Sequence, residues 1–524
     1  MKEVTPQDVK VMISDGEEIA FLDVREHGQY GEGHPFFSVS LPFSQIELLA
    51  PKLMPCVGVR CVVMDDGDEI AERAASVLSQ LGYENILILK GGAPAWAAAG
   101  YTLFKGVNLP SKTFGELVEH KFDTPRVSAN ALKAMIDSDQ DIVVLDGRSG
   151  PEYKKMTIPT SQSCPNAELG YRLSSLCENP ETPVIVNCAG RTRSIIGAQG
   201  LRLLNVPNPV YALENGTQGW RLAGFDLMHG CDPEPLPIPS KEDWEAGRAL
   251  AETLRRDYGL QRVMYADAEA WLADTSQTTY LFDVRSEAEF EKGHVAGARS
   301  APGGQLVQAT DEQLAVRNAR IILSCDNGLR SVTTAIWLAG MGHHVWLLDI
   351  DTPMDDVSMS SNRSQDLRNE ISVDTLKEKI DAGMRILDVS KGLDYRAGHI
   401  EGAAWATRAR LSKEAIGDPA ELVVVGQSRA LLAGIIAEIE HLSGGLPSGV
   451  HHGDPDQWAA AGLRIVNTPD DPSEVDCIDH LFFVHDRHDG NLDAARRYLE
   501  WETGLLAQLD DQESGMLRPL EPAN

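Results

Sequence analysis

Cys188 has the surroundings best suited to nucleophilic chemistry among the eight cysteines of this 524-residue sequence. It follows the apolar run 184–187 and opens a loop made of Ala189, Gly190, Arg191, Thr192, Arg193 and Ser194, ahead of a helical pattern. Backbone N–H groups and the positive end of that helix would converge on the sulfur and stabilise a thiolate. We therefore predict that the pKa of Cys188 lies below its usual value of about 8.5, with Arg191 and Arg193 attracting an anionic ligand.

A second cysteine has the same setting. Cys325 follows the apolar run 321–324 and precedes Asp326, Asn327, Gly328, Leu329, Arg330 and Ser331. The carboxylate of Asp326 next to the sulfur would oppose thiolate formation. Two interpretations stay open for Cys325: a second reactive site, or a retained loop with little activity.

The remaining cysteines are interpreted as small buried hydrophobic residues: Cys56, Cys61, Cys164, Cys177, Cys231 and Cys477. No CxxC pair occurs, and the cysteines are too sparse for a disulfide framework, so structural zinc is unsupported. The acidic run from Asp65 to Glu69 has neither histidine nor the spacing of a calcium loop. We predict no metal and no organic cofactor.

One unit, repeated four times, positions these residues. An apolar strand that ends in aspartate recurs at Asp23, Asp146, Asp283 and Asp388. A second apolar strand follows in every copy, and the residue after it lies 42 positions past the aspartate in the first three copies, at Asp65, Cys188 and Cys325. The fourth copy has Gly426 there. Alternating strands and helical patterns predict an α/β fold in which each copy is a parallel sheet flanked by helices.

Copies one and four lack the sulfur. The acidic loop that begins at Asp65 would repel anionic ligands, and the fourth copy also has Ser390 where the other three have arginine. We predict that both copies are unreactive and serve as scaffolding or as partner-binding domains.

Two further recurring features are assigned to structure. The pairs Asp23/Arg25, Asp146/Arg148 and Asp283/Arg285 occur even in the copy without cysteine. The histidines His34, His294 and His399 are absent from copy two, where Thr157 takes their place and the best nucleophile lies. We therefore predict that these histidines act in packing or capping, not in catalysis.

The length supports about three or four domains at roughly 150 residues each. The repeat places them at residues 1–105, 123–230, 259–350 and 369–465, followed by a helical extension over 466–524. Within the extension, a helical rhythm from Asn491 to Leu509 predicts a docking helix. Linkers are expected at Cys231–Pro239 and at Asp349–Asp366.

Charge and hydropathy narrow the partners and the location. The formal net charge of −31 would repel nucleic acid and anionic lipid surfaces. No run of 18 apolar residues occurs, and the first residues lack a secretory pattern. We predict a cytoplasmic protein with neither a nucleic acid nor a membrane as partner.

The combined pattern resembles the rhodanese family over roughly residues 1–465. Asp283-Val284-Arg285, the segment 293–298 and the Gly216-x-x-x-Trp220 turn carry the resemblance. It implies a five-stranded parallel α/β fold and a sulfurtransferase that works by double displacement, with Cys188 as the persulfide carrier. Arg193, and Cys325 as a second nucleophile, would belong to the catalytic group. Substrate binding would fall to Ala189, Gly190, Arg191, Thr192, Ser194 and Arg330.

The resemblance implies thiosulfate as default donor and cyanide or a thiol as acceptor, with protein partners for the unreactive copies. Two other classes stay open. One is a non-catalytic persulfide carrier or scaffold. The other is a phosphatase or arsenate reductase on the same fold, which would need five residues between cysteine and arginine, whereas Cys188 and Arg193 have four.

Overall fold

The computed structural model of the chain describes residues 2–349, 351–352, 354, 366–484, 486–488 and 490–523. Two compact units make up the chain. Unit 1 comprises residues 1–11, 20–107 and 359–483, and unit 2 comprises residues 12–19, 108–358 and 484–524. Unit 1 therefore holds the first and fourth copies of the repeat, and unit 2 holds the second and third copies with the C-terminal segment.

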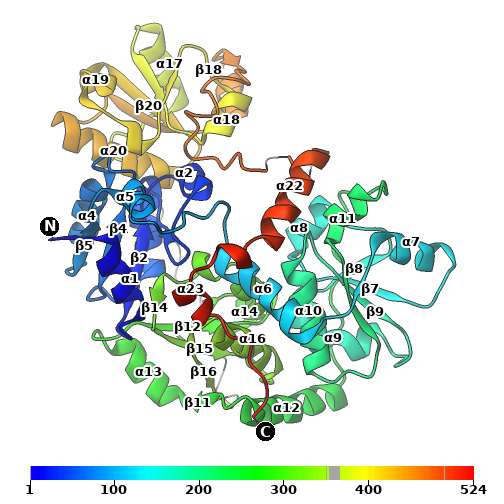
Figure 1. Ribbon diagram of the computed structural model, residues 1–524. Helices are drawn as coiled ribbons and strands as arrows, with labels where there is room; N and C mark the ends of the chain where they lie inside the picture. The colour runs from blue at the N-terminus through cyan, green and yellow to red at the C-terminus, as the bar shows by residue number, and fades with distance from the viewer. Residues whose placement is uncertain are drawn as a thin grey trace. The chain divides into compact units, whose positions relative to one another are not determined.

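The second copy shows the topology that all copies share. Its strands lie in the order β6 (Arg126–Val127), β10 (Val210–Leu213), β9 (Val184–Asn187), β7 (Val143–Asp146) and β8 (Ser161–Ser163). Every neighbouring pair is parallel. Parallel pairing requires a crossover after each strand, and helices fill these crossovers (Figure 1). The predicted α/β fold with parallel sheets flanked by helices is confirmed.

The same strand order recurs in the other copies. The first has β1 (Lys2–Val4), β5 (Ile86–Leu89), β4 (Cys61–Met64), β2 (Ile19–Asp23) and β3 (Val39–Ser40). The third has β11 (Gln261–Val263), β16 (His344–Leu348), β15 (Arg320–Ser324), β12 (Thr279–Asp283) and β13 (Arg299–Ser300). The fourth has β21 (Gly449–His452), β20 (Leu422–Gly426), β17 (Arg385–Asp388) and β19 (Ala404–Trp405), and a single parallel bridge from Glu370 to Val450 stands where the other copies have an edge strand.

The helices of unit 1 are α1 (Pro6–Ser14, which ends outside the unit), α2 (His27–Glu32), α3 (Ile46–Leu53), α4 (Ile70–Gln80), α5 (Gly92–Ala98), α17 (Val373–Asp381), α18 (Gly392–Ala397), α19 (Lys413–Ile416), α20 (Arg429–Ser443) and α21 (Pro455–Ala460). Those of unit 2 are α6 (Leu109–Phe122), α7 (Ala129–Asp137), α8 (Gly150–Lys155), α9 (Asn166–Leu176), α10 (Thr192–Leu203), α11 (Gly216–Leu222), α12 (Lys241–Asp257), α13 (Tyr265–Ala273), α14 (Glu287–Lys292), α15 (Gly303–Gln308), α16 (Leu329–Gly340), α22 (Leu492–Thr503) and α23 (Asp511–Gly515). Two short strands, β18 (His399–Ile400) and β22 (Ile465–Val466), pair antiparallel, and β14 (Val316–Arg317) precedes β15.

Strand β9 is buried on both faces, because successive side chains point to opposite sides of the sheet. Val184 and Val186 pack with residues of α9 and α10 on one side. Ile185 packs with Leu132 of α7 and Trp220 of α11 on the other. This two-sided burial explains the unbroken apolar run before Cys188 and fixes the end of the strand in space.

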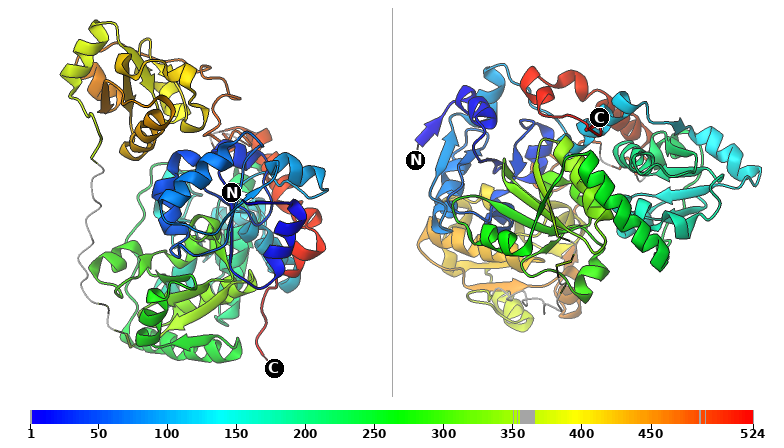
Figure 2. Two further views of the ribbon diagram at one scale, coloured as in Figure 1. Left: turned by 90° about the vertical axis from the view of Figure 1, so that its left-hand side faces the viewer. Right: turned by 90° about the horizontal axis from the view of Figure 1, so that it is seen from below.

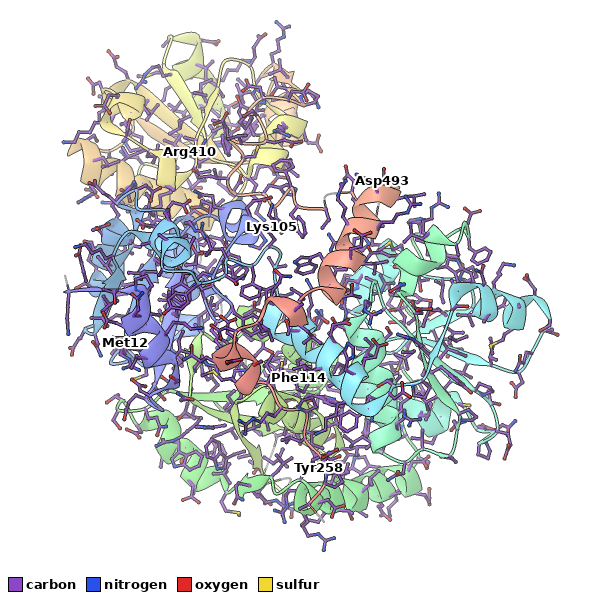
Figure 3. The ribbon with its side chains drawn as sticks, in the orientation of Figure 1. Met12, Lys105, Phe114, Tyr258, Arg410 and Asp493 are labelled. Carbon is purple, nitrogen blue, oxygen red and sulfur yellow. The ribbon has the colours of Figure 1, made fainter. Side chains whose placement is uncertain are left out.

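Helix α6 connects the second and third copies within unit 2. It packs along α10, and its Phe114, labelled in Figure 3, lies edge-on to Trp337 of α16 with ring centroids 6.3 Å apart. Helix α9 also packs against α15 and α16, and α12 lies beside α16 (Figure 2). The two copies that carry Cys188 and Cys325 are therefore packed against each other through helices.

The C-terminal segment contains a shorter helix than the rhythm predicts. Helix α22 covers 492–503, Gly504 follows, and a 3-10 turn occupies Leu506–Gln508. Its contacts run to α6 and α11 (Figure 1), so it docks on the second copy. Residues 231–240 form neither helix nor strand, as expected for the first linker, whereas most of the second, Asp349–Asp366, lies outside the described residues. In the described part of the chain no helix is long and apolar enough to cross a membrane.

Candidate active site

Cys188 lies where β9 passes into the loop before α10. Only 1% of the residue is exposed, and its thiol donates to the hydroxyl of Ser194 over 3.5 Å. Ser194 in turn donates to the carbonyl of Arg191 at 2.8 Å. The sulfur is therefore enclosed by its own loop, at the carboxyl end of a central strand, which is the edge where ligands bind in open parallel sheets.

The turn before α11 forms the wall behind the loop. Gly216 has a φ of +54°, and a Cβ there would lie 2.2 Å from the Cys188 carbonyl oxygen. The N–H groups of Thr217 and Gln218 donate to the carbonyls of Cys188 and Ala189 at 2.8 and 3.1 Å. Glycine is required for this close approach and for the left-handed conformation. The predicted Gly-x-x-x-Trp turn thus holds the cysteine loop through its backbone.

Arg193 is held by a carboxylate from the neighbouring crossover. Both of its terminal nitrogens donate to Glu152 of α8, each over 2.7 Å. Burial raises the pKa of Glu152, but Arg193 and the Ser149 hydroxyl outweigh burial and bring that pKa to about 2. The pair is bidentate, so it fixes the plane of the guanidinium as well as its position. Arg193 is thereby positioned near the sulfur.

Arg191 differs from the prediction. Its guanidinium donates to Glu116 of α6 at 2.6 and 2.9 Å and also pairs with Glu119. A cation shared by two carboxylates has little charge left to attract an anionic ligand. In this structure Arg191 fastens the loop to α6, and sequence reasoning did not foresee the two glutamates.

Helix α22 covers the loop from above. Glu502 is 1% exposed and accepts a hydrogen bond of 2.7 Å from the hydroxyl of Thr192. Its second oxygen would lie 3.0 Å from a Cβ built on Gly190, and the ring of Tyr498 would lie 3.1 Å from it. Gly190 therefore lets the helix approach the loop closely, and a carboxylate from the C-terminal segment stands beside Cys188.

Burial raises the pKa of Cys188, which corrects the expectation of a lowered value. Arg193 and the hydrogen bonds from Ser194 oppose burial, and the charge of Glu502 reinforces it. A thiol that is removed from water loses the solvation of its charged form, and one guanidinium already paired with Glu152 does not restore it. The closed loop therefore holds a thiol, and the positive charges predicted to activate it are largely neutralised.

Cys325 lies in an equivalent loop between β15 and α16. Its thiol donates to the carboxylate of Asp326 over 3.3 Å. Arg330 is fully buried and pairs with Glu168, Glu289 and Asp326 at 2.7 to 2.9 Å. Burial raises the pKa of Cys325, Arg330 opposes this and Asp326 adds to it. Arg172 also pairs with Glu168 and Glu289, so three carboxylates share two arginines and negative charge remains in excess around this loop.

The side chain of Asp65 closes the equivalent loop of the first copy. One oxygen of Asp65 accepts from the N–H of Gly67 at 2.8 Å and the other accepts from that of Ala71 at 3.0 Å. A carboxylate thus occupies the position of the sulfur and uses the backbone donors around it. In the fourth copy Gly426 has no side chain to react, and Ser428 caps α20 instead.

The recurring Asp-x-Arg pairs have the structural role that was predicted. Arg148 donates to Asp146 at 2.6 and 2.8 Å and to the Met156 carbonyl at 2.6 Å. Arg25 and Arg285 make the same contacts in their copies. Each of the three recurring histidines stacks on the ring of the aromatic residue four positions earlier. Its Nδ1 also hydrogen-bonds to the backbone carbonyl of that residue. These groups fix the first crossover of each sheet.

Sequence reasoning identified Asp326 but missed the other carboxylates around the two cysteine loops. Glu152 and Glu289 each lie six positions past the strand-ending aspartate, so an equal offset marked them. Glu116, Glu119 and Glu502 come from segments outside the repeat, and Glu502 is 310 residues from Thr192. No local pattern connects residues so far apart in the chain.

Fold and loops together define a class of protein with tandem parallel sheets, in which a short loop joins a central strand of each sheet to the following helix. The family known as Rhodanese-like domain matches residues 5–99, 128–223 and 265–351, which are the first three copies. These regions cover more than half of the chain, and the chain belongs to this family.

Two relatives show how far the likeness extends. The chain is similar to the crystal structure of thiosulfate sulfurtransferase from Pseudomonas aeruginosa, with 38% identity, coverage of 99% of both chains and a TM-score of 0.89. It is also 33% identical over 84 residues to the putative sulfur carrier protein YrkF of Bacillus subtilis (strain 168), and this match covers 16% of the chain and 44% of that relative.

Proposed function

We propose that the chain is a sulfurtransferase that moves sulfane sulfur from an anionic donor such as thiosulfate to cyanide or a thiol through a persulfide on Cys188. The observation that carries the proposal is the geometry of Cys188 and Arg193. The sulfur stands at the end of a central strand, and the guanidinium is fixed beside it by Glu152. The likeness to a thiosulfate sulfurtransferase over 99% of the chain supports the same reaction.

The reaction proceeds in two displacements. The Cys188 thiolate attacks the outer sulfur of thiosulfate, the sulfur–sulfur bond breaks, and sulfite leaves with the bonding electron pair. The acceptor then attacks the outer sulfur of the Cys188 persulfide, and Cys188 leaves as a thiolate. Cyanide becomes thiocyanate in this step. Arg193 offsets the negative charge that is present on the sulfur in both displacements.

The buried thiol requires activation, and opening of the loop would supply it. A thiol that is neutral in the closed loop loses its proton more readily once the site opens to water or Glu502 moves away. The loop amides of Ala189, Gly190 and Thr192 then remain as donors to the persulfide, together with the hydroxyl of Ser194. We propose these donor roles for the loop residues.

Cys325 is proposed as a secondary site of low activity. Asp326 accepts from its thiol, and Arg330 is shared among three carboxylates, so anionic donors meet negative charge there. Copies one and four are proposed as scaffolding or partner-binding domains, since Asp65 fills its own loop.

All eight cysteines are free thiols, which suits the reducing cytoplasm that we propose as the location. Neither a nucleic acid nor a membrane is proposed as a partner, given the charge of −31.

A persulfide carrier is the second candidate, favoured by the likeness to a putative sulfur carrier protein. The two functions differ in turnover. A carrier would accept one sulfur and release it slowly to small acceptors, whereas a sulfurtransferase would cycle with thiosulfate and cyanide.

The test is thiosulfate:cyanide turnover by the wild type, Cys188→Ser and Cys325→Ser, with intact mass measured after exposure to thiosulfate. We expect turnover and a mass increase of about 32 Da, one sulfur, in the wild type and in Cys325→Ser. Cys188→Ser should lose both. A stoichiometric adduct without turnover would favour the persulfide carrier. Hydrolysis of aryl phosphate or reduction of arsenate would favour a phosphatase or an arsenate reductase.

A further inference from the structure

A cavity of about 510 Å³ lies beside the Cys188 loop and is built partly by the C-terminal segment. Thr217 and Gln218 of α11 line it on one side, and Arg487, His488 and Gly490 line it on the other. These last residues lie outside the repeated unit. The cavity therefore belongs to this chain's own arrangement of its C-terminal segment over the second copy.

Gln218 links the cavity to the reactive loop. Its backbone N–H donates to the Ala189 carbonyl at 3.1 Å, and its side-chain nitrogen would lie 3.4 Å from a Cβ on Gly190. The residue is 3% exposed, and neither its amide oxygen nor its amide nitrogen has a hydrogen-bond partner among the described residues. A buried amide with both groups unpaired is costly, so a ligand with a donor and an acceptor would be stabilised there.

Arg487 supplies positive charge to the same cavity. Its guanidinium lies 4.5 Å from the ring centroid of Tyr498, which holds it in place. Within the described residues no carboxylate pairs with Arg487, whereas the other arginine of the cavity, Arg221, pairs with Asp226 at 2.9 Å. His488 is neutral at physiological pH, because burial lowers its pKa to about 3. Arg487 is thus the group suited to a carboxylate on a ligand.

We propose that this cavity binds the sulfur acceptor and that the acceptor is a small thiol bearing amide and carboxylate groups. The inference rests on the proposed sulfurtransferase function. The ligand's amide would pair with Gln218 and its carboxylate with Arg487. Its sulfur would reach the Cys188 loop once Glu502 and Tyr498 withdraw from Gly190. The acceptor thiol releases its proton to solvent, its thiolate attacks the outer sulfur of the Cys188 persulfide, and Cys188 leaves as a thiolate.

The size of the cavity and its polar groups favour the acceptor over the sulfur donor. The volume lies within the range of about 300–1,000 Å³ typical of small-molecule sites and far exceeds what thiosulfate needs. Thiosulfate carries neither an amide nor a carboxylate.

The experiment compares two acceptors on the full chain. Glutathione offers amides and carboxylates, and 2-mercaptoethanol offers neither. We expect the ratio of kcat/KM for glutathione to that for 2-mercaptoethanol to fall about tenfold in Gln218→Met and in Arg487→Met, which corresponds to about 1.4 kcal/mol. Arg487→Lys should restore part of the ratio. Arg496→Met, which removes an exposed arginine from α22, is the matched control and should keep the wild-type ratio.

A direct binding measurement tests the cavity independently of sulfur transfer. S-methylglutathione cannot accept sulfur, so its binding, measured by calorimetry, needs no turnover. Saturable binding by the wild type that weakens in Gln218→Met and Arg487→Met supports the cavity even if thiosulfate is not the donor. Absence of binding at millimolar concentration, or equal binding by all variants, would overturn it, as would an unchanged acceptor ratio. Thermal unfolding of each variant shows whether it is folded, and Arg487→Lys provides the comparison if Arg487→Met is not.

Discussion

The carboxylate of Glu152 accepts a hydrogen bond from each terminal nitrogen of Arg193, both at 2.7 Å. Glu289 and Arg330 repeat this pair in the third copy, at 2.7 and 3.1 Å. Both glutamates cap the helix in which they lie, through a serine three residues earlier. In the second and third copies, the first crossover helix is therefore tied to the cysteine loop by one glutamate.

Glu152→Gln should impair sulfur transfer more than it impairs folding. The amide keeps the size of the side chain but cannot accept two charge-assisted hydrogen bonds, so Arg193 loses its fixed orientation. We expect kcat/KM with thiosulfate to fall about tenfold or more. Glu289→Gln is the matched control in the third copy. An equal loss from that variant would place the reaction at Cys325.

The pair of Glu152 and Arg193 makes the free energy of unfolding depend on pH under acidic conditions. The folded pKa of Glu152, about 2, lies below its ordinary value of 4.5. The pair therefore contributes stability that is complete above about pH 4.5 and is lost as the pH falls through about 2. The difference in unfolding free energy between wild type and Glu152→Gln should shrink over this window. A difference that stays constant down to pH 2 would contradict the assignment.

Asp388 should destabilise the fourth copy at neutral pH. Burial raises its pKa to about 6, and Ser390 stands where the first three copies have an arginine paired with the equivalent aspartate. The stability linked to this carboxyl is complete below pH 3.8 and is lost as the pH rises through about 6. Asp388→Asn should therefore raise the midpoint of thermal unfolding at pH 7.5 and have little effect at pH 4.

Asp283→Asn provides the contrast, because Asp283 is paired with Arg285 at 2.6 Å. Removing one partner of a buried pair costs about 3–5 kcal/mol. We expect this variant to lower the unfolding midpoint at pH 7.5. If both aspartate variants moved the midpoint in the same direction, the missing arginine would not explain the behaviour of Asp388.

Glu502→Gln should make Cys188 more acidic. The charge of Glu502 adds to the effect of burial on the pKa of Cys188, so its removal lowers that pKa, although burial persists and keeps it raised. The measurement is the pH dependence of Cys188 alkylation by iodoacetamide, followed by peptide mass spectrometry. Glu500→Gln, on the exposed side of α22, is the control and should leave the profile unchanged.

Asp65→Ala should destabilise the first copy. The substitution leaves the N–H groups of Gly67 and Ala71 without their acceptor. Gly67 is exposed to water, whereas Ala71 is buried, so the cost is about 1–3 kcal/mol for the Ala71 donor. Urea unfolding of the full chain would measure the loss. The exposed Glu84→Ala should stay within about 0.5 kcal/mol of the wild type. Equal stability of Asp65→Ala and wild type would show that water replaces the carboxylate.

The sequence predicts what is local and repeated. The apolar runs before Asp65, Cys188 and Cys325 form central strands, and the loop after β9 passes into a helix at Thr192, because burial on both faces leaves few other conformations for such runs. The direction of Arg191 was not predictable from its neighbours. Its partners Glu116 and Glu119 lie more than 70 residues away on α6.

The pKa of Cys188 shows the same limit. The glycine and arginines of its loop indicate a thiolate when they are considered alone. The helix that buries the loop and the carboxylate of Glu502 come from the C-terminal segment, and burial is the larger effect. A prediction from composition counts charges, whereas the structure shows which of them are already paired.

The contact between Thr192 and Glu502 spans 310 residues of chain. A ribosome that adds about 5–20 residues per second produces Glu502 roughly 15–60 seconds after Thr192. During that interval the second copy can fold without helix α22 over its Cys188 loop. The newly made protein therefore passes through a period in which Glu502 and Tyr498 are absent from Gly190, and synthesis of the last helix completes the wall over the loop.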